Sequence, residues 1–156
     1  MTALWLLSLL LRQTAAPAPV EQPIPFSHKL HADRGLKCAF CHPMKDSGEA
    51  AGLPRLSECA GCHESLVKES AALRVLASYA GAEGVPWQRV YRLPSFVFFS
   101  HRRHADAGAG CERCHGAVAQ REILAREGDI SMKACVGCHR EWKASAACNF
   151  CHEIER

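Results

Sequence analysis

The sequence has few large side chains from which a protein could build an interior. Its 156 residues include only two Tyr, three Trp and six Phe. Hydrophobic residues make up 48% of the chain, but this figure counts ten cysteines, a leucine-rich N-terminus and many alanines. We therefore expect no large aliphatic core, in one small domain or two very small ones. Something other than side chains has to fill the interior.

The chain also lacks an apolar run long enough to span a bilayer. The run near the N-terminus has about nine residues, which suits the core of a signal peptide better than a membrane span. Arg12 and a stretch of small residues follow it, with cleavage expected after Ala16 or Ala18. We predict a signal peptide over residues 1–18. No Lys or Arg precedes the run and proline follows each cleavage point, so a short uncleaved anchor or a wrongly assigned start is the alternative.

Neither sign of charge dominates the sequence. Nineteen Lys and Arg face sixteen Asp and Glu, which gives a formal net charge of +3. This modest excess provides no reason to expect a nucleic-acid partner or electrostatic attachment to a membrane surface.

No cysteine stands alone in the sequence. Every one of the ten belongs to a Cys-x-x-Cys pair, and histidine directly follows every pair. Two thiols three positions apart can form thioethers to the two vinyl groups of one haem, and the next residue then places an imidazole on the iron. The pattern predicts five covalently attached c-type haems. The attaching cysteines are Cys38 and Cys41, Cys59 and Cys62, Cys111 and Cys114, Cys135 and Cys138, and Cys148 and Cys151, and the proximal iron ligands are His42, His63, His115, His139 and His152.

A structural zinc module is the alternative, because Cys-x-x-Cys pairs also occur in zinc ribbons. Zinc ribbons do not require a histidine after each pair, and four-cysteine sites would use the pairs in twos and leave one of the five unused. Haem attachment is the better interpretation. Since covalent haem attachment takes place outside the cytoplasmic membrane, the motifs also predict a periplasmic protein, or one on the outer face of the cytoplasmic membrane of a bacterium.

The four remaining histidines reveal an internal repeat. They lie in two nearly identical segments, residues 26–32 and 99–105, which are offset by 73 positions. The same offset carries the first Cys-x-x-Cys-His motif onto the third. The repeat predicts a dihaem half over 19–80, a connector over 81–97 and a trihaem half over 98–156.

Each repeated segment carries a His-x-x-His pair, with His28 and His31 in the first and His101 and His104 in the second. Haem iron has two axial positions, and the motif histidine supplies one, so these histidines are natural donors for the other side. On one helical turn, or splayed from an extended stretch, they could reach two different haems. Ordinary surface histidines, or core histidines bonded to the backbone, are the alternative.

The Phe-x-His-x-x-His segment ahead of a Cys-x-x-Cys-His motif resembles the class III cytochrome c family of compact multihaem cytochromes. The resemblance implies a small, mainly α fold with extensive loops, in which short helices wrap around a stack of five haems. It also implies which distal histidine binds each haem. The pairs are His28 with the haem at Cys38, His31 with that at Cys59, His101 with that at Cys111, and His104 with that at Cys135.

The fifth haem, at Cys148, is left without a distal histidine. In three-haem members of this family, the ligand for the last haem lies shortly before the preceding Cys-x-x-Cys motif. Met132 lies three residues before Cys135, whereas the equivalent residue of the first half is Leu56. We predict that Met132 is the distal ligand. The alternatives are that Met132 only packs in the core, that Met44 is the ligand, or that the sixth position is open.

Between the halves, the spacing of apolar residues over 64–80 predicts a helix that Gly81 and Gly84 would end. Residues 86–99 read as extended chain, whose aromatic side chains would cover a haem edge or form a docking surface. Three segments look like the pentahaem subunit of alternative complex III and related quinol-oxidising complexes: this connector, the Ser-His-x-x-His after it, and the later Met-Lys-x-Cys-x-x-Cys-His-Arg. The resemblance covers about residues 24–155.

We expect an electron carrier and predict no catalytic residue. Five haems on so short a chain must lie close together, so electrons can pass between them without motion of the protein. The resemblance implies redox protein partners, including a membrane-bound quinol-oxidising complex, with membrane association through these partners or the N-terminus. A soluble periplasmic shuttle, or a haem reductase with one open iron, is the alternative. Ten axial positions match nine histidines plus Met132, which favours the carrier, and a methionine ligand would give the fifth haem the highest potential.

Overall fold

The computed structural model of the protein describes residues 17–44, 50–64 and 70–153. Most of the predicted signal segment therefore lies outside the described residues. Within these ranges the regular structure consists of short helices joined by long loops, with two isolated β-bridges and no strand. This confirms the mainly α, loop-rich fold that the sequence predicts. The helices are α1 (His28–Ala32), α2 (Cys38–Cys41), α3 (Leu56–His63), α4 (Ala71–Ala77), α5 (His101–Asp106), α6 (Glu112–His115), the 3-10 helix η1 (Val118–Gln120), α7 (Met132–Glu141) and α8 (Cys148–Cys151).

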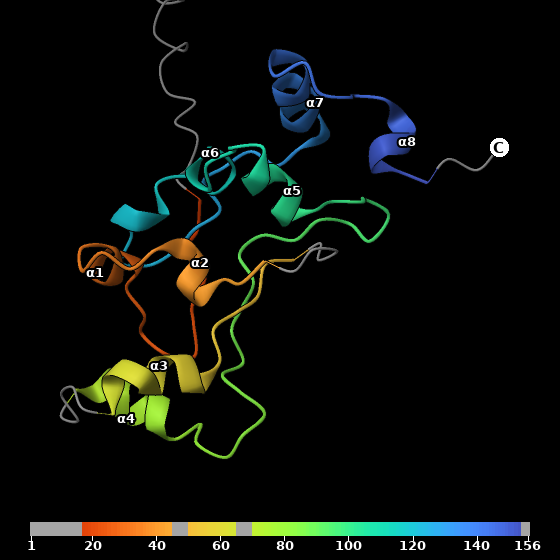
Figure 1. The fold of residues 1–156 in the computed structure, drawn as a ribbon. Coiled ribbons are helices and arrows are strands. Elements are labelled where there is room, and N and C mark those ends of the chain that lie inside the picture. Colours follow the sequence, from red (N-terminus) through yellow and green to blue (C-terminus); the bar gives the residue numbers. More distant parts are fainter. Residues whose placement is uncertain (1–16, 45–49, 65–69, 154–156) are drawn as a thin grey trace, which may run out of the picture.

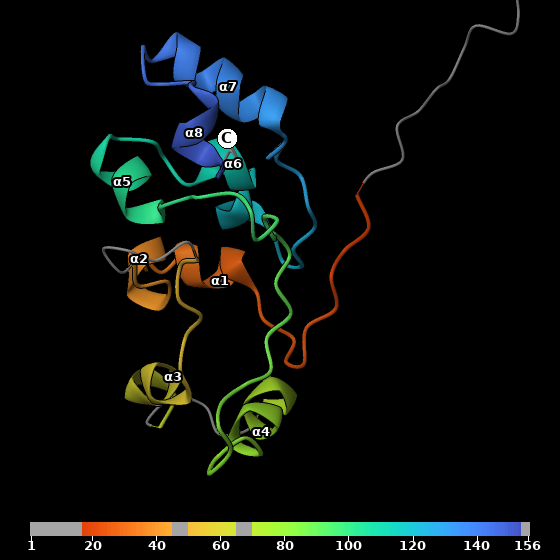
Figure 2. The same cartoon turned by 90° about the vertical axis from the view of Figure 1, so that its right-hand side faces the viewer.

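The helices are arranged in layers along one long direction of the molecule. Helices α3 and α4 lie at one end, α1 and α2 come next, then α5 and α6, with α7 and α8 at the other end (Figure 1). A view turned by 90° about this direction keeps the same order (Figure 2). The two halves of the sequence repeat therefore lie end to end.

The segment before α1 joins the two halves. Pro19 forms an antiparallel bridge with Ala125, and the amide of Val20 donates a hydrogen bond to the Leu124 carbonyl at 2.8 Å. Helix α1 then packs against η1, where the Lys29 amide donates to the Arg121 carbonyl at 3.0 Å. The helix that carries the first His-x-x-His pair is thus held against the loop that follows the third Cys-x-x-Cys-His motif.

The connector runs along the molecule without forming a helix or strand within its described residues. Near its start, the side chain of Gln22 exchanges two hydrogen bonds of 2.9 and 3.0 Å with the backbone of Gln88. At its end, Val97 forms an antiparallel bridge with His152, and the Phe98 amide donates to the Cys151 carbonyl at 2.8 Å. The connector thereby ties the C-terminal motif to the start of the trihaem half.

The helix predicted over 64–80 is shorter in the structure. Helix α4 begins after Ser70, whose hydroxyl accepts a hydrogen bond from the Leu73 amide at 3.1 Å and caps the helix there. Gly81 follows the end of the helix with a φ of +86°, a left-handed conformation that suits glycine. Residues 65–69 of the predicted helix lie outside the described residues. None of the helices in the described ranges has the length and apolar character that crossing a membrane requires.

Side chains alone form almost no core in the described part of the chain. Ile24 is the one buried hydrophobic residue there, with 4% of its surface exposed. Ten large hydrophobic side chains in the same ranges are exposed instead: Leu30, Phe40, Val75, Leu93, Phe96, Phe98, Ile123, Met132, Trp142 and Phe150. Apolar surface on this scale needs a large apolar group to cover it, because folding depends on its burial.

Candidate haem-binding sites

Each Cys-x-x-Cys-His motif forms a turn of helix. In the first, third and fifth motifs, the histidine amide donates a hydrogen bond of 3.0 to 3.1 Å to the carbonyl of the first cysteine. The second and fourth motifs lie inside the longer helices α3 and α7. Residues three apart on a helix share a face, so the two thiols of each motif point the same way. All ten cysteines lie in the described residues, and no disulfide joins any two of them there.

The structure brings eight of the nine histidines together in pairs of rings. Each pair joins one histidine of a His-x-x-His segment with one motif histidine. The ring centroids are 6.3 Å apart for His28 and His42, 6.2 Å for His31 and His63, 6.1 Å for His101 and His115, and 5.9 Å for His104 and His139. These are the pairings that the resemblance to class III cytochromes implies.

The spacing of the rings fits a metal between them. When two imidazoles bind one metal from opposite sides, each metal–nitrogen bond is about 2 Å long. Adding the distance from each nitrogen to its ring centre puts the two ring centres about 6 Å apart. Rings in direct contact would lie closer, as Phe26 and His31 do at 4.4 Å. Each pair of imidazoles could therefore provide both axial ligands of one haem iron, while the two thiols of the same motif could attach the haem ring.

The residues before each His-x-x-His pair orient its second histidine. The Ser27 hydroxyl caps α1 by accepting from the Leu30 amide at 2.9 Å, and the Ser27 carbonyl accepts from Nδ1 of His31 at 2.8 Å. Phe26 stacks on the same imidazole with 22° between the planes. With Nδ1 bonded to the backbone, Nε2 is left to bind a metal.

The second repeat has the same local structure. The Ser100 hydroxyl accepts from the Arg103 amide at 3.3 Å, its carbonyl accepts from Nδ1 of His104 at 2.8 Å, and Phe99 stacks on that ring at 4.5 Å. The sequence pattern alone predicted no role for these serines and phenylalanines. A serine directly before each pair is a helix N-cap signal that could have identified the start of both helices.

Several motif histidines are held in the same way. Nδ1 of His42 donates to the Gly52 carbonyl at 2.8 Å, and Nδ1 of His139 donates to the Ser145 carbonyl at 2.5 Å. A metal-binding histidine usually donates its other ring nitrogen to a carbonyl or carboxylate, which fixes the tautomer and the ring orientation. These bonds therefore prepare the motif histidines as ligands through Nε2.

Two of the paired histidines lie in poorly hydrated surroundings. Nδ1 of His28 and Nδ1 of His63 are buried without a hydrogen-bond partner in the described structure. Burial lowers the pKa of His28 from 6.5 to about 4, with smaller contributions from the charges of His42 and His31. Burial is also the main cause of a lowered pKa at His115. The imidazoles of His28 and His115 therefore stay neutral near pH 7, and the neutral form is the one that binds a metal.

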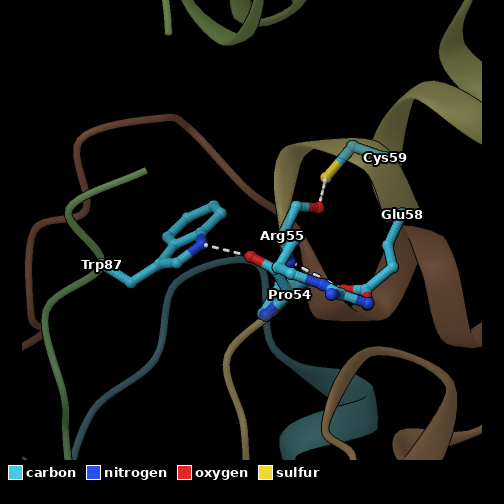
Figure 3. Close-up of polar contacts among 5 residues, drawn as sticks. All are labelled: Pro54, Arg55, Glu58, Cys59 and Trp87. Carbon is cyan, nitrogen blue, oxygen red and sulfur yellow. Dashed lines mark hydrogen bonds and ion pairs between the residues drawn. The ribbon is translucent and has the colours of Figure 1, made fainter. Parts of the chain in front are cut away.

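The start of α3 positions the second haem motif (Figure 3). The Glu58 carboxylate accepts hydrogen bonds from the Arg55 amide at 2.7 Å and from the Arg55 guanidinium at 3.1 Å, which satisfies a free amide at the start of the helix. The thiol of Cys59 lies 3.6 Å from the Arg55 carbonyl, while the Trp87 indole donates to the Pro54 carbonyl at 3.3 Å. Trp87 also meets Phe26 edge to face at 5.9 Å. This connector aromatic thus braces the dihaem half.

Tyr91 braces the third motif, and the sequence analysis did not single it out. Its hydroxyl donates to the His115 carbonyl at 3.2 Å and accepts from the Gly128 amide at 2.8 Å, while its ring meets the His115 imidazole edge to face at 4.6 Å. A Cβ on Gly128 would lie 1.8 Å from the Cys114 carbonyl oxygen, so only glycine fits this close approach. The fold of residues around 128 therefore depends on the third haem turn.

The fifth motif is built differently from the other four. The ring nearest to His152 in the described contacts is that of Phe96, with centroids 5.8 Å apart, and Nδ1 of His152 donates to the Phe96 carbonyl at 3.3 Å. Met132 starts α7 just as Leu56 starts α3, and 67% of its surface is exposed. Met44 is half-buried beside the first motif. Among the described contacts, none joins either methionine to His152, so the methionine ligand stays a prediction.

Thiols of different motifs lie beside one another. Burial is the largest cause of a raised pKa at five of them, and a thiol from another motif adds to the rise in each case. The pairs that meet in this way are Cys41 with Cys62, Cys59 with Cys41, Cys111 with Cys38, Cys114 with Cys138, and Cys135 with Cys114 and Cys151. Each motif therefore has a neighbour, including one neighbour across the two halves.

The residues present fit the haem groups that the motifs require. A covalently bound macrocycle needs three features that are found here. The thiols are paired on one helical face, the imidazoles are paired at a distance that leaves room for a metal between them, and side chains alone form almost no core. Among the described residues, no cluster of three or more His, Cys, Asp or Glu side chains has the arrangement of a metal-ion site.

Comparisons with known proteins place the two halves in related families. The class III cytochrome C family matches residues 10–79, and the family of cytochrome c7 and related cytochromes c matches residues 97–153. The menaquinone reductase multihaem cytochrome c subunit of Nitratidesulfovibrio vulgaris (strain Hildenborough) is 39% identical over 106 residues, which are 66% of this chain and 49% of that protein. This chain thus spans about half the length of that curated relative. The chain belongs to the class III and cytochrome c7-type multihaem cytochromes c, which bind c-type haem and carry electrons.

Proposed function

We propose that this chain is a periplasmic pentahaem cytochrome that conducts electrons to or from a quinone-linked respiratory complex in the membrane. The observation that carries the proposal is the set of four imidazole pairs at 5.9 to 6.3 Å, each beside its own two thiols. A fifth pair of thiols on α8, with His152 next to it, completes the count of five.

The chain's own residues hold and tune the haems. Each pair of motif cysteines would form two thioethers to one haem, and the motif histidine would be the first ligand of its iron. His28, His31, His101 and His104 would supply the second ligand of four irons, and Met132 would supply that of the fifth. Each haem supplies a one-electron couple when bound. Ligation of every iron on both sides prevents substrates from binding there, which favours electron transfer over reduction of a small molecule.

The relative's name supports the partner in this proposal. That protein is a subunit of a menaquinone reductase, so in its complex electrons move towards the quinone. The resemblance to quinol-oxidising complexes agrees on a quinone partner but implies the opposite direction. We propose the direction that the relative's name states, with this chain receiving electrons from a redox partner and passing them towards menaquinone.

The haem content is tested on the purified exported protein. Intact mass and the pyridine haemochrome assay together give the number of haems per chain, for which we expect five. A protein with no haem but with bound zinc would support the structural zinc module instead. A haem count between one and four per chain would contradict the pentahaem assignment. Carbon monoxide added to the reduced protein should leave its spectrum unchanged, whereas a shift would reveal an open iron and favour a haem reductase.

The partner is tested by purifying the chain from native membranes. We expect membrane subunits to co-purify, and the complex to reduce a soluble menaquinone analogue when its haems have been reduced beforehand. Oxidation of the reduced analogue without the forward reaction would reverse the proposed direction. Recovery of the chain alone in the soluble fraction would favour the shuttle.

A further inference from the structure

We propose that the two halves exchange electrons through one junction, between the first and third haem sites, and that the second haem site is one end of the path. This inference rests on the proposed function, since it needs the haems to be present.

Two short helices make neighbours of sites within each half. Helix α1 carries both His28, which pairs with His42 of the first site, and His31, which pairs with His63 of the second. One turn of helix separates these two distal ligands, so the first and second irons lie close together. Helix α5 does the same for the third and fourth sites, through His101 and His104.

The contacts between the halves bring the first and third sites together. Helix α1 packs against η1, which begins three residues after His115 of the third motif. The thiol of Cys38 from the first motif lies beside the thiol of Cys111 from the third. Since both sulfurs would attach to haem rings, the haems held by the first and third motifs would lie close together here. Figures 1 and 2 agree, because α2 and α6 lie in adjacent layers.

The second site lies away from the trihaem half. Its helix α3 occupies the outer layer with α4, on the far side of α1 and α2 from α5 and α6 (Figure 2). The thiol neighbour of Cys59 is Cys41, of the first motif. At the opposite end, Arg113 of the third motif bonds Glu141 of α7 at 2.5 Å, and Cys135 of the fourth motif neighbours Cys151 of the fifth.

The consequence is a path with two separate ends. An electron that enters at the second site has to pass the first site before it reaches the third, and it then spreads to the fourth and fifth sites. One redox partner therefore docks near α3 and the other near α7 and α8. A compact cluster with all five haems in mutual contact would instead let both partners use the same face.

Proton NMR of the fully reduced holoprotein tests this arrangement, because cross-relaxation between haem protons identifies haems in contact. We expect contacts between the first and second haems and between the first and third. We expect none between the second haem and the third, fourth or fifth. Contact of the second haem with any of these three, or no contact between the first and third, would overturn the inference.

Three variants assign the resonances. In His28→Met, His31→Met and His101→Met, a methionine ligand raises the potential of the first, second or third haem and marks it in a redox titration. If a variant fails to fold, the spectrum of the wild-type protein still tests the arrangement. In that spectrum, at least one haem must contact a single neighbouring haem, and that neighbour must contact only one further haem. Fewer than five sets of haem resonances would contradict the proposed function, whereas five sets in another pattern would contradict this inference alone.

Discussion

The imidazole rings of His28 and His42 lie almost parallel, 6° apart in plane and 6.3 Å between centroids. The equivalent residues of the second repeat, His101 and His115, are arranged in the same way, at 11° and 6.1 Å. The other two pairs are rotated, by 64° for His31 and His63 and by 45° for His104 and His139. The repeat in sequence is thus also a repeat in the geometry of the candidate ligands.

Replacing His28 with alanine should open one iron out of five. The small side chain cannot reach the metal, so the reduced variant is expected to bind one equivalent of carbon monoxide, while the wild-type protein binds none. Optical titration with the gas measures this. Lys29→Ala, on the exposed side of the same helix, is the control and should behave as wild type. A His28→Ala protein that does not bind the gas would show that His28 is not a distal ligand.

Exchanging Met132 for histidine should lower the potential of a single haem. Imidazole stabilises the oxidised iron more than a thioether does, so the most oxidising component of the titration should move down while the other four stay in place. Redox titration followed at the haem absorption bands measures this. Met44→Leu is the matched control and should leave all five components unchanged. If the titration of Met132→His equals that of the wild type, Met132 is not the ligand.

Loss of the Ser100 hydroxyl should weaken α5. Removing a serine N-cap costs about 1 kcal/mol of stability, so Ser100→Ala should lower the free energy of unfolding by about that amount. Denaturant unfolding of the holoprotein followed by circular dichroism checks the value. Ser95→Ala, at an exposed serine in a turn, serves as the control and should change stability little. Equal stability of the two variants would argue against a structural role for the cap.

An alanine at position 128 should disrupt the third haem turn. Its Cβ would lie 1.8 Å from the Cys114 carbonyl oxygen, so the backbone of one segment would have to move. We expect a loss of several kcal/mol in stability, comparable to other severe backbone clashes, and a reduced yield of fully haem-loaded protein. Gly110→Ala is the control, since a Cβ there meets nothing within 4 Å. Similar haem loading of both variants would contradict the close approach.

Acid should release the His28 ligand only at low pH. Burial lowers the pKa of His28 to about 4 from 6.5, so the folded protein resists protonation there while the unfolded chain does not. The unfolded state therefore binds the extra proton first, and the resulting contribution to stability is complete above pH 6.5 and declines as the pH falls towards 4. Iron would compete with the proton for the same imidazole, so the low-spin absorption of the first haem should persist well below pH 6.5. Its loss near pH 6.5 would show that burial does not protect this ligand.

Much of the candidate site could be predicted from the sequence because its chemistry is local. A Cys-x-x-Cys-His motif needs one helical turn, and a His-x-x-His pair after a capping serine needs another, so their spacing is visible along the chain. The resemblance to class III cytochromes implied the four ring pairs that the structure forms. The bracing roles of Tyr91 and Phe96 could not be predicted, since each acts on a motif at least 24 residues away.

The sequence by itself determined that this is a multihaem cytochrome, because thioether attachment and axial ligation are properties of residues close together in the chain. Tertiary structure alone decided which haem motifs become neighbours. Cys38 meets Cys111, and Phe98 bonds Cys151, only because α1 packs on η1 and the connector pairs with the C-terminal motif. Such contacts depend on how distant segments pack together, and no local pattern of residues encodes them.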